Sequence, residues 1–197
     1  MALVLTGLPV ADGAAGTPPP QTEVQARDDW FLPFVASVPR GGTVVWTFAD
    51  AERSHTATDS SGMALFDSGI LPPGGPSFSY RFTAAGVYPY TCTVHTTKMN
   101  GSVEVPVRVW PEAAPTERSF HVRWASRPAA EGFVFDVQIK PPGGSWVIWR
   151  EGVTAPKALF DPDGEGHFRF RARLRAVSGG ATGWSRRATL TASSTAS

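Results

Sequence analysis

The stretch YTCTVHTTKMNGSVEV, residues 90–105, joins two features that decide how the chain folds and where its chemistry lies. In its second half Val103 and Val105 alternate with Glu104, which is the period-2 pattern of a half-buried β-strand. Its first half closes the segment VYPYTC and holds Cys92, the one cysteine in 197 residues. The stretch therefore predicts a strand, a short loop that carries the cysteine, and a second strand.

The same alternation recurs throughout the sequence, whereas helical periodicity is rare. Turn signals such as PRGG, LPPGGP and AAGV separate the alternating segments. Short strands at regular spacing predict an all-β chain of the sandwich or barrel type. We expect strands in TVVWTF (43–48), FSYRF (78–82), SVEVPVRV (102–109), SFHVRW (119–124), FVFDVQI (133–139), SWVIW (145–149) and HFRFRARLRA (167–176).

The segment VWPEAAPTER, residues 109–118, interrupts the strand pattern with two prolines, two alanines and acidic residues. Such a composition is typical of an inter-domain linker. We therefore predict a flexible leader or signal remnant over 1–22, one β-domain over 23–109, a linker over 110–117 and a second β-domain over 118–194.

The first twenty residues have a short apolar core and small residues but lack a basic start, so they match a secretory signal incompletely. We expect an extracellular, periplasmic or cell-surface location. No apolar run reaches the ~20 residues that a membrane-spanning helix needs.

Cys92, His95 and Met99 follow one another with the spacing C-x2-H-x3-M. One loop can bring a thiolate, an imidazole and a thioether around a point, and this donor set favours copper. A His2Cys copper site with a weak axial methionine requires a second histidine, and His55 is available in the same predicted domain. The residues alone leave open a zinc ion, or no metal with Cys92 and Met99 as ordinary core residues.

Residues 23–109 resemble a cupredoxin of the plastocyanin/azurin group, the type 1 blue copper proteins. The resemblance runs through FLPFVASVPRGGTVVWTFAD, SHTATD and the pattern Y-x-C-x2-H…M-x-G-x-V-x-V. It implies a Greek-key β-sandwich and one type 1 copper ion. It makes His55 and His95 the imidazole ligands, Cys92 the thiolate ligand and Met99 the weak axial ligand.

The resemblance also implies one-electron transfer between Cu(I) and Cu(II), with a redox protein partner near His95. Thr56 stands where several members have an asparagine, so the hydrogen bonds around the cysteine are expected to differ. The serine hydrolase pattern G-x-S-x-G and the metalloprotease pattern H-E-x-x-H are absent, so we do not expect an enzyme. Copper storage or delivery, or a metal-free adhesion or scaffold module, remain as alternatives.

Residues 118–194 resemble a fibronectin type III module, through FHVRWASRP and FRARLRAVSGGATGWS. In the strand HFRFRARLRA the alternation turns Arg169, Arg171, Arg173 and Arg175 to the outer face. These arginines could bind an acidic partner or a polysaccharide. The alternative is a solvated face that discourages edge pairing. Nucleic acid is not expected as a partner.

Overall fold

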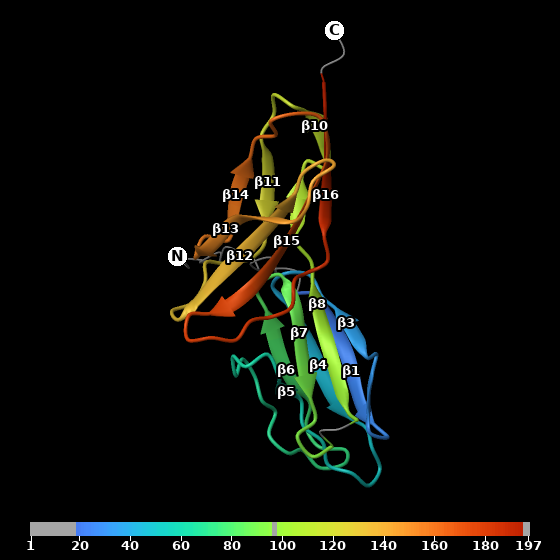
Figure 1. Cartoon of the computed structure of the whole chain (residues 1–197). Helices are drawn as coiled ribbons and strands as arrows, with labels where there is room; N and C mark the ends of the chain where they lie inside the picture. Colours follow the sequence, from blue (N-terminus) through green and yellow to red (C-terminus); the bar gives the residue numbers. More distant parts are fainter. Residues whose placement is uncertain (1–18, 96–97, 195–197) are drawn as a thin grey trace, which may run out of the picture.

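The computed structural model describes residues 19–95 and 98–194, and in this part of the chain every regular element is a β-strand (Figure 1). The fold class is therefore all-β, as predicted. The strands before Pro106 are β1 (Gln21–Arg27), β2 (Trp30–Leu32), β3 (Val35–Ser37), β4 (Gly42–Phe48), β5 (Thr58–Asp59), β6 (Phe78–Phe82), β7 (Gly86–Thr91) and β8 (Asn100–Val105). Those after it are β9 (Arg108–Trp110), β10 (Ala113–Pro115), β11 (Phe120–Arg123), β12 (Phe133–Lys140), β13 (Val147–Val153), β14 (Lys157–Phe160), β15 (Gly166–Ala176) and β16 (Ala188–Ser193). A helix able to cross a membrane is not found among the described residues.

The first eight strands form two four-stranded sheets packed face to face. One sheet has the order β2-β1-β4-β6 and the other has the order β3-β8-β7-β5. Alternating residues of both sheets meet in one hydrophobic cluster, in which Trp46 stacks on Phe66 and meets Tyr90 edge-on, each at 5.4 Å between ring centroids. Because Tyr90 lies two residues before Cys92, this packing fixes the end of β7 from which the cysteine emerges.

The last eight strands form a second sandwich. Its larger sheet has the order β10-β16-β15-β12-β13, and the smaller has the order β14-β11-β9. The inward residues Phe168, Phe170 and Ala172 of β15 are buried, which confirms the alternation predicted there. They pack in a separate hydrophobic cluster around Trp124.

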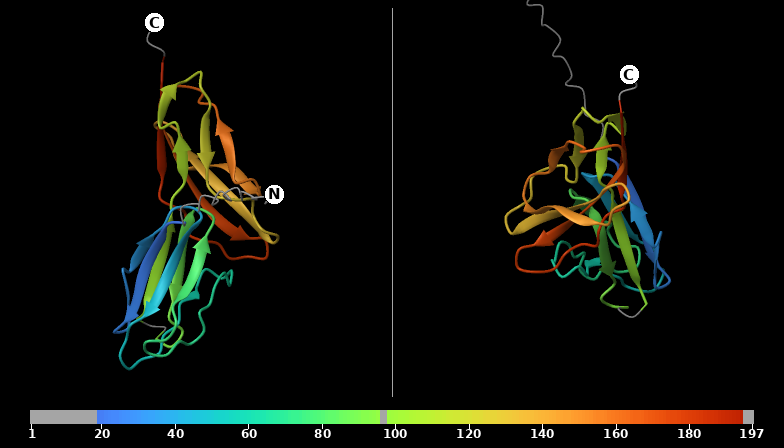
Figure 2. Two further views of the ribbon diagram at one scale, coloured as in Figure 1. Left: turned by 180° about the vertical axis from the view of Figure 1, so that it is seen from behind. Right: turned by 45° about the horizontal axis from the view of Figure 1, so that its top comes forward.

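The two sandwiches touch directly, end to end (Figure 2). Val87 of β7 and Gly183 exchange two backbone hydrogen bonds of 2.9 and 2.8 Å. Gly86 meets Thr182 so closely that a Cβ atom would lie 2.4 Å from the Thr182 hydroxyl oxygen, so only glycine fits there. Arg186 pairs with Glu104 across the same junction.

The strand predicted over residues 102–109 is two strands. Pro106 has no N–H to donate, and β8 ends at Val105, just before it. After Val107 the chain enters the smaller sheet of the second sandwich as β9. Val103 and Val105 are buried in the first cluster, and Val107 and Val109 in the second, so one alternating run serves two cores.

Two further bounds differ from the expected ones. β1 begins at Gln21, inside the segment predicted as a flexible leader over 1–22, and residues 1–18 lie outside the described part. The segment predicted as a linker over 110–117 holds β10, which pairs in parallel with β16. The division into domains 23–109 and 118–194 stays a prediction.

Candidate metal centre

Two loops at one end of the first sandwich bring the predicted metal ligands together. This end, where β7 finishes and β8 begins, is opposite the end that touches the second sandwich (Figure 1). His55 follows β4 and is held by a two-bond backbone pair with Leu71, at 3.1 and 2.9 Å. Cys92 follows β7, and its backbone N–H donates to the carbonyl of Met99 at 2.9 Å, which closes the base of the second loop.

The cysteine sulfur lies close to one ring nitrogen of each imidazole. Cys92 Sγ is 3.9 Å from His55 Nδ1 and 3.6 Å from His95 Nδ1. The candidate ligand atoms of these three residues all lie within 4.8 Å of one another. His55 and Cys92 are fully buried, so two of the three donor groups meet away from water.

These separations fit a metal ion. Bonds of about 2.3 Å to sulfur and about 2.0 Å to nitrogen, set at trigonal angles, place the two donor atoms about 3.7 Å apart. The observed 3.6 and 3.9 Å lie on either side of that value. The residues present therefore fit a metal held by one thiolate and two Nδ1 atoms.

Each histidine has a carboxylate at its other ring nitrogen, which sequence reasoning did not find. Asp50 Oδ2 lies 3.1 Å from His55 Nε2, and Asp29 Oδ1 lies 3.5 Å from His95 Nε2. A carboxylate at Nε2 favours the tautomer that carries its proton there, which leaves Nδ1 free for a metal. Neither Asp29 nor Asp50 belongs to a recognisable ligand motif in the sequence, so only the folded loops show that they lie beside the histidines.

Both carboxylates are held in the ionised form. A hydrogen bond from the Glu52 backbone N–H, followed by the contact with His55, lowers the pKa of Asp50 far below its usual range. A hydrogen bond from Arg53 is the main cause that lowers the pKa of Asp29. Two fixed negative charges therefore face the imidazoles and strengthen them as donors to a cation.

Thr56 ties the two loops together at the cysteine. Its backbone N–H donates to Cys92 Sγ at 3.3 Å, and its side-chain oxygen accepts a hydrogen bond from the Thr93 backbone N–H at 2.8 Å. The Thr58 hydroxyl also donates to that oxygen, at 2.9 Å. We expect different hydrogen bonds here because Thr56 stands where several cupredoxins have an asparagine. The structure shows the Thr56 hydroxyl accepting a hydrogen bond from the backbone of the cysteine loop.

We expect Thr56→Val to weaken metal binding about tenfold or more, because hydrogen-bonding partners that orient ligands typically contribute that much. Thr56→Ser keeps the hydroxyl and should bind nearly as tightly as the unchanged chain. Competition with a copper chelator measures both affinities. Equal affinities in the valine and serine variants would show that the Thr56 side-chain oxygen does not support the site.

Met99 is fully buried in the same cluster as Cys92, and its N–H donates to the carbonyl of His95 at 3.1 Å. Its backbone thus belongs to the ligand loop. Its role as a weak axial ligand stays a prediction, as do the metal-binding roles of His55, Cys92 and His95.

Two of the outward arginines of β15, Arg173 and Arg175, are engaged within the second sandwich. Arg173 Nε and Arg175 Nε donate to the buried carboxylate of Asp136 at 3.0 and 2.9 Å, and the Gly152 N–H donates to it at 3.0 Å. Burial raises the pKa of Asp136, but the hydrogen bonds from Arg175, Gly152 and Arg173 outweigh it and lower the pKa overall.

Arg171 also makes contacts within the second sandwich. Its Nε donates to Gln138 at 2.8 Å, and its guanidinium lies 4.3 Å from the ring centroid of Trp146 and 5.2 Å from that of Trp184. Binding of an acidic partner or polysaccharide at Arg169, Arg171, Arg173 and Arg175 stays a prediction, and such a partner would compete with these contacts.

Comparison with known proteins gives matches among solved structures alone. The sequence matches no protein-family model and no curated protein. A purple cupredoxin from Nitrosopumilus maritimus is 26% identical with a TM-score of 0.39, over 42% of this chain and 97% of that one. An oxidised amicyanin variant is 27% identical with a TM-score of 0.38, over 49% of this chain and 85% of that one.

A copper-containing nitrite reductase from Thermus scotoductus is 30% identical with a TM-score of 0.39, over 50% of this chain and 25% of that one. These TM-scores are low, so the functional conclusion depends on the geometry of the site itself. The resemblance of residues 118–194 to a fibronectin type III module and the expectation that the chain is not an enzyme stay predictions.

Proposed function

We propose that the chain is a copper-binding electron-transfer protein with one type 1 site. His55, Cys92 and His95 would hold the metal, with Met99 as a weak axial ligand. The observation that carries the proposal is the position of Cys92 Sγ, 3.9 and 3.6 Å from the Nδ1 atoms of two histidines. One thiolate with two imidazoles favours copper, because structural zinc sites usually contain more cysteines.

The surroundings of the site suit a redox centre that must not rearrange. When bound, copper would supply one-electron chemistry between Cu(I) and Cu(II). Cys92 and His55 lie on loops closed by backbone hydrogen bonds, and the hydrogen bond from the Thr56 N–H reaches the sulfur. A hydrogen bond to a ligating sulfur stabilises the thiolate and tunes the reduction potential.

His95 provides the route to the surface. Its side chain is 24% exposed, whereas that of His55 is 0% exposed. An electron would therefore pass through the His95 ring to a redox protein that docks over it. The identity of that partner and an extracellular, periplasmic or cell-surface location belong to the same proposal.

Voltammetry of the copper-loaded full-length chain tests electron transfer separately from binding. We expect a reversible one-electron wave. Backbone hydrogen bonds close both ligand loops, so the loops need not rearrange when the copper changes oxidation state. Bound copper without a reversible wave, together with rapid loss of copper to a chelator, would favour storage or delivery instead.

We expect Met99→Leu to keep the visible absorption of the copper-loaded chain and to raise the reduction potential. Loss of the thioether removes a weak donor and makes the site more apolar, which disfavours the more highly charged Cu(II) state. Voltammetry of this variant beside the unchanged chain measures the shift. An unchanged potential would remove Met99 from the ligand set.

A further inference from the structure

The outer face of the sheet β14-β11-β9 carries a row of cations that the metal site does not involve. Arg108 of β9 lies directly opposite Arg123 of β11, and Arg123 lies directly opposite Lys157 of β14. Neighbouring strands are ~4.8 Å apart, so the row spans about 10 Å. All three residues are exposed and line one hollow of about 320 Å³.

This row is electrostatically costly as it stands. Like charges placed directly opposite on paired strands destabilise a sheet. Within residues 19–95 and 98–194, no ion pair joins Arg108, Arg123 or Lys157 to a carboxylate. An anionic ligand would relieve the repulsion, whereas Arg173 and Arg175 of β15 already share Asp136.

A fourth cation adjoins the row from the first sandwich. Arg40 donates through Nη1 to the carbonyl of Pro106, and its Nε is buried without a hydrogen-bond partner. Burial is the main cause that lowers the pKa of Arg40 to about 10, and the charges of Arg108 and Arg123 contribute. Positive charge therefore gathers on this face beside the junction of the two sandwiches.

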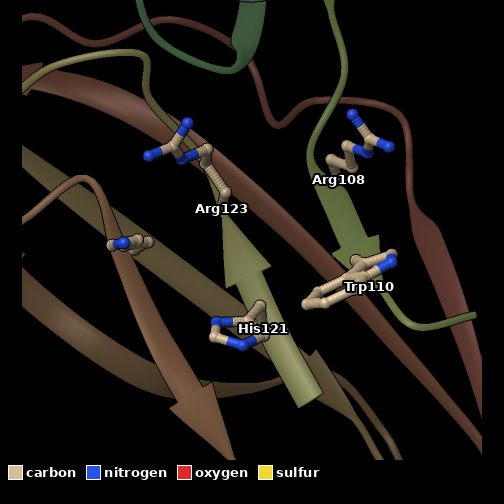
Figure 3. A pocket seen from close by; sticks show the side chains of 5 residues that line it. Arg108, Trp110, His121 and Arg123 are labelled. Carbon is tan, nitrogen blue, oxygen red and sulfur yellow. The ribbon is translucent and has the colours of Figure 1, made fainter.

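Next to the cations lies an aromatic platform. Trp110 and His121 are cross-strand partners one row away, with ring centroids 5.2 Å apart and planes tilted by 33°. Figure 3 shows them side by side on neighbouring strands, with Arg108 and Arg123 beside them. Trp110 is 59% exposed, which leaves its ring open to a ligand.

We propose that this face, formed by Arg108, Trp110, His121, Arg123 and Lys157, binds an acidic polysaccharide. The carboxylate or sulfate groups would pair with the cation row, because guanidinium groups bind such oxyanions with two parallel hydrogen bonds. A sugar ring would pack its C–H face on Trp110, whose ring offers apolar area and whose N–H offers a donor.

The same features are a poorer match to nucleic acid. Proteins that bind single strands without sequence preference place successive bases on several aromatic platforms along a basic groove. Here one Trp–His platform stands beside one row of cations, and the whole chain carries a net charge of only +1. An acidic polysaccharide needs only a cluster of cations beside one aromatic ring, and this face offers both.

Binding of short oligomers to the full-length chain, measured by calorimetry at low ionic strength, tests this proposal. The probes are a galacturonic acid oligomer and dextran sulfate, with dextran as the neutral control and single-stranded DNA as a competing polyanion. We expect at least one acidic saccharide to bind and dextran not to bind. Arg123→Ala and Trp110→Ala should each weaken binding about tenfold.

Arg187→Ala removes an exposed arginine outside this face and should change the affinity by less than about twofold. Thermal unfolding of each variant confirms that the fold is kept, since Trp110 and Arg123 are both exposed. The proposal is overturned if neither acidic saccharide binds, if Arg187→Ala weakens binding as much as Arg123→Ala, or if single-stranded DNA binds as tightly as the saccharide. These outcomes are independent of copper, because the metal site lies at the other end of the first sandwich.

Discussion

Cys92→Ser is expected to abolish the intense visible absorption of the copper-loaded chain. That absorption requires charge transfer from a thiolate, and Cys92 is the one cysteine in the sequence. Serine is close in size to cysteine, so the fully buried position can keep its packing beside Tyr90 and Met99. An absorption spectrum after addition of Cu(II) measures the effect directly.

Two controls separate lost binding from lost folding. Circular dichroism should show the same strand content in Cys92→Ser as in the unchanged chain, and thermal unfolding should remain cooperative. His121→Ala alters an exposed histidine on the second sandwich and should leave the absorption intact. An unchanged spectrum in Cys92→Ser would contradict the assignment of Cys92 as a ligand.

Asp136→Ala is expected to lower the free energy of unfolding of the second sandwich by about 3 kcal/mol. The carboxylate of Asp136 is 1% exposed and accepts hydrogen bonds from Arg173, Arg175 and Gly152. Its removal leaves two guanidinium groups side by side without their shared anion. We take the lower end of the usual range because each guanidinium side chain is about a third exposed.

Urea unfolding of the full-length chain, followed by tryptophan fluorescence, measures this loss. Asp163→Ala alters an exposed acid in the turn before β15 and should change stability by less than about 0.5 kcal/mol. If Asp136→Ala is no more destabilising than Asp163→Ala, the arginine cluster does not depend on Asp136.

The contribution of Asp136 should also depend on pH. Its pKa in the folded chain is below the value of about 3.9 expected in the unfolded chain, so the ionised form stabilises the fold above that value. The stabilisation is lost as the pH falls through the folded pKa. We therefore expect the stability gap between the unchanged chain and Asp136→Asn to be constant near neutral pH and to narrow below about pH 4. Urea unfolding at several pH values measures that gap, and a gap that widens in acid would contradict the prediction.

The strands were predictable because burial on one face forces alternation, as in Val44, Trp46 and Phe48 of β4. The break at Pro106 was not, because Val107 and Val109 continue the same alternation while they serve a different core. The grouping of His55, Cys92 and His95 at one point was predictable from residue type and spacing, and their roles as metal donors stay a prediction. The carboxylates of Asp29 and Asp50 were not, because only the loop fold brings them to the imidazoles.

Charge on the second sandwich shows the same limit. The arginines of β15 were predicted to face outward, and the alternation holds, but the sequence does not reveal that Asp136 of β12 lies opposite Arg173. Conversely, Arg108, Arg123 and Lys157 are far apart in the sequence and form a row only through strand register. Register depends on turn geometry and on which strands pair, and periodicity carries no information on either.

Titration of the purified full-length chain with Cu(II), followed by its visible absorption, tests the copper site most directly. A trigonal site of one thiolate and two imidazoles predicts an intense charge-transfer band that grows with added copper and stops at one equivalent. A correctly folded chain that stays colourless, or that takes up copper without this band, would contradict the copper site formed by His55, Cys92 and His95.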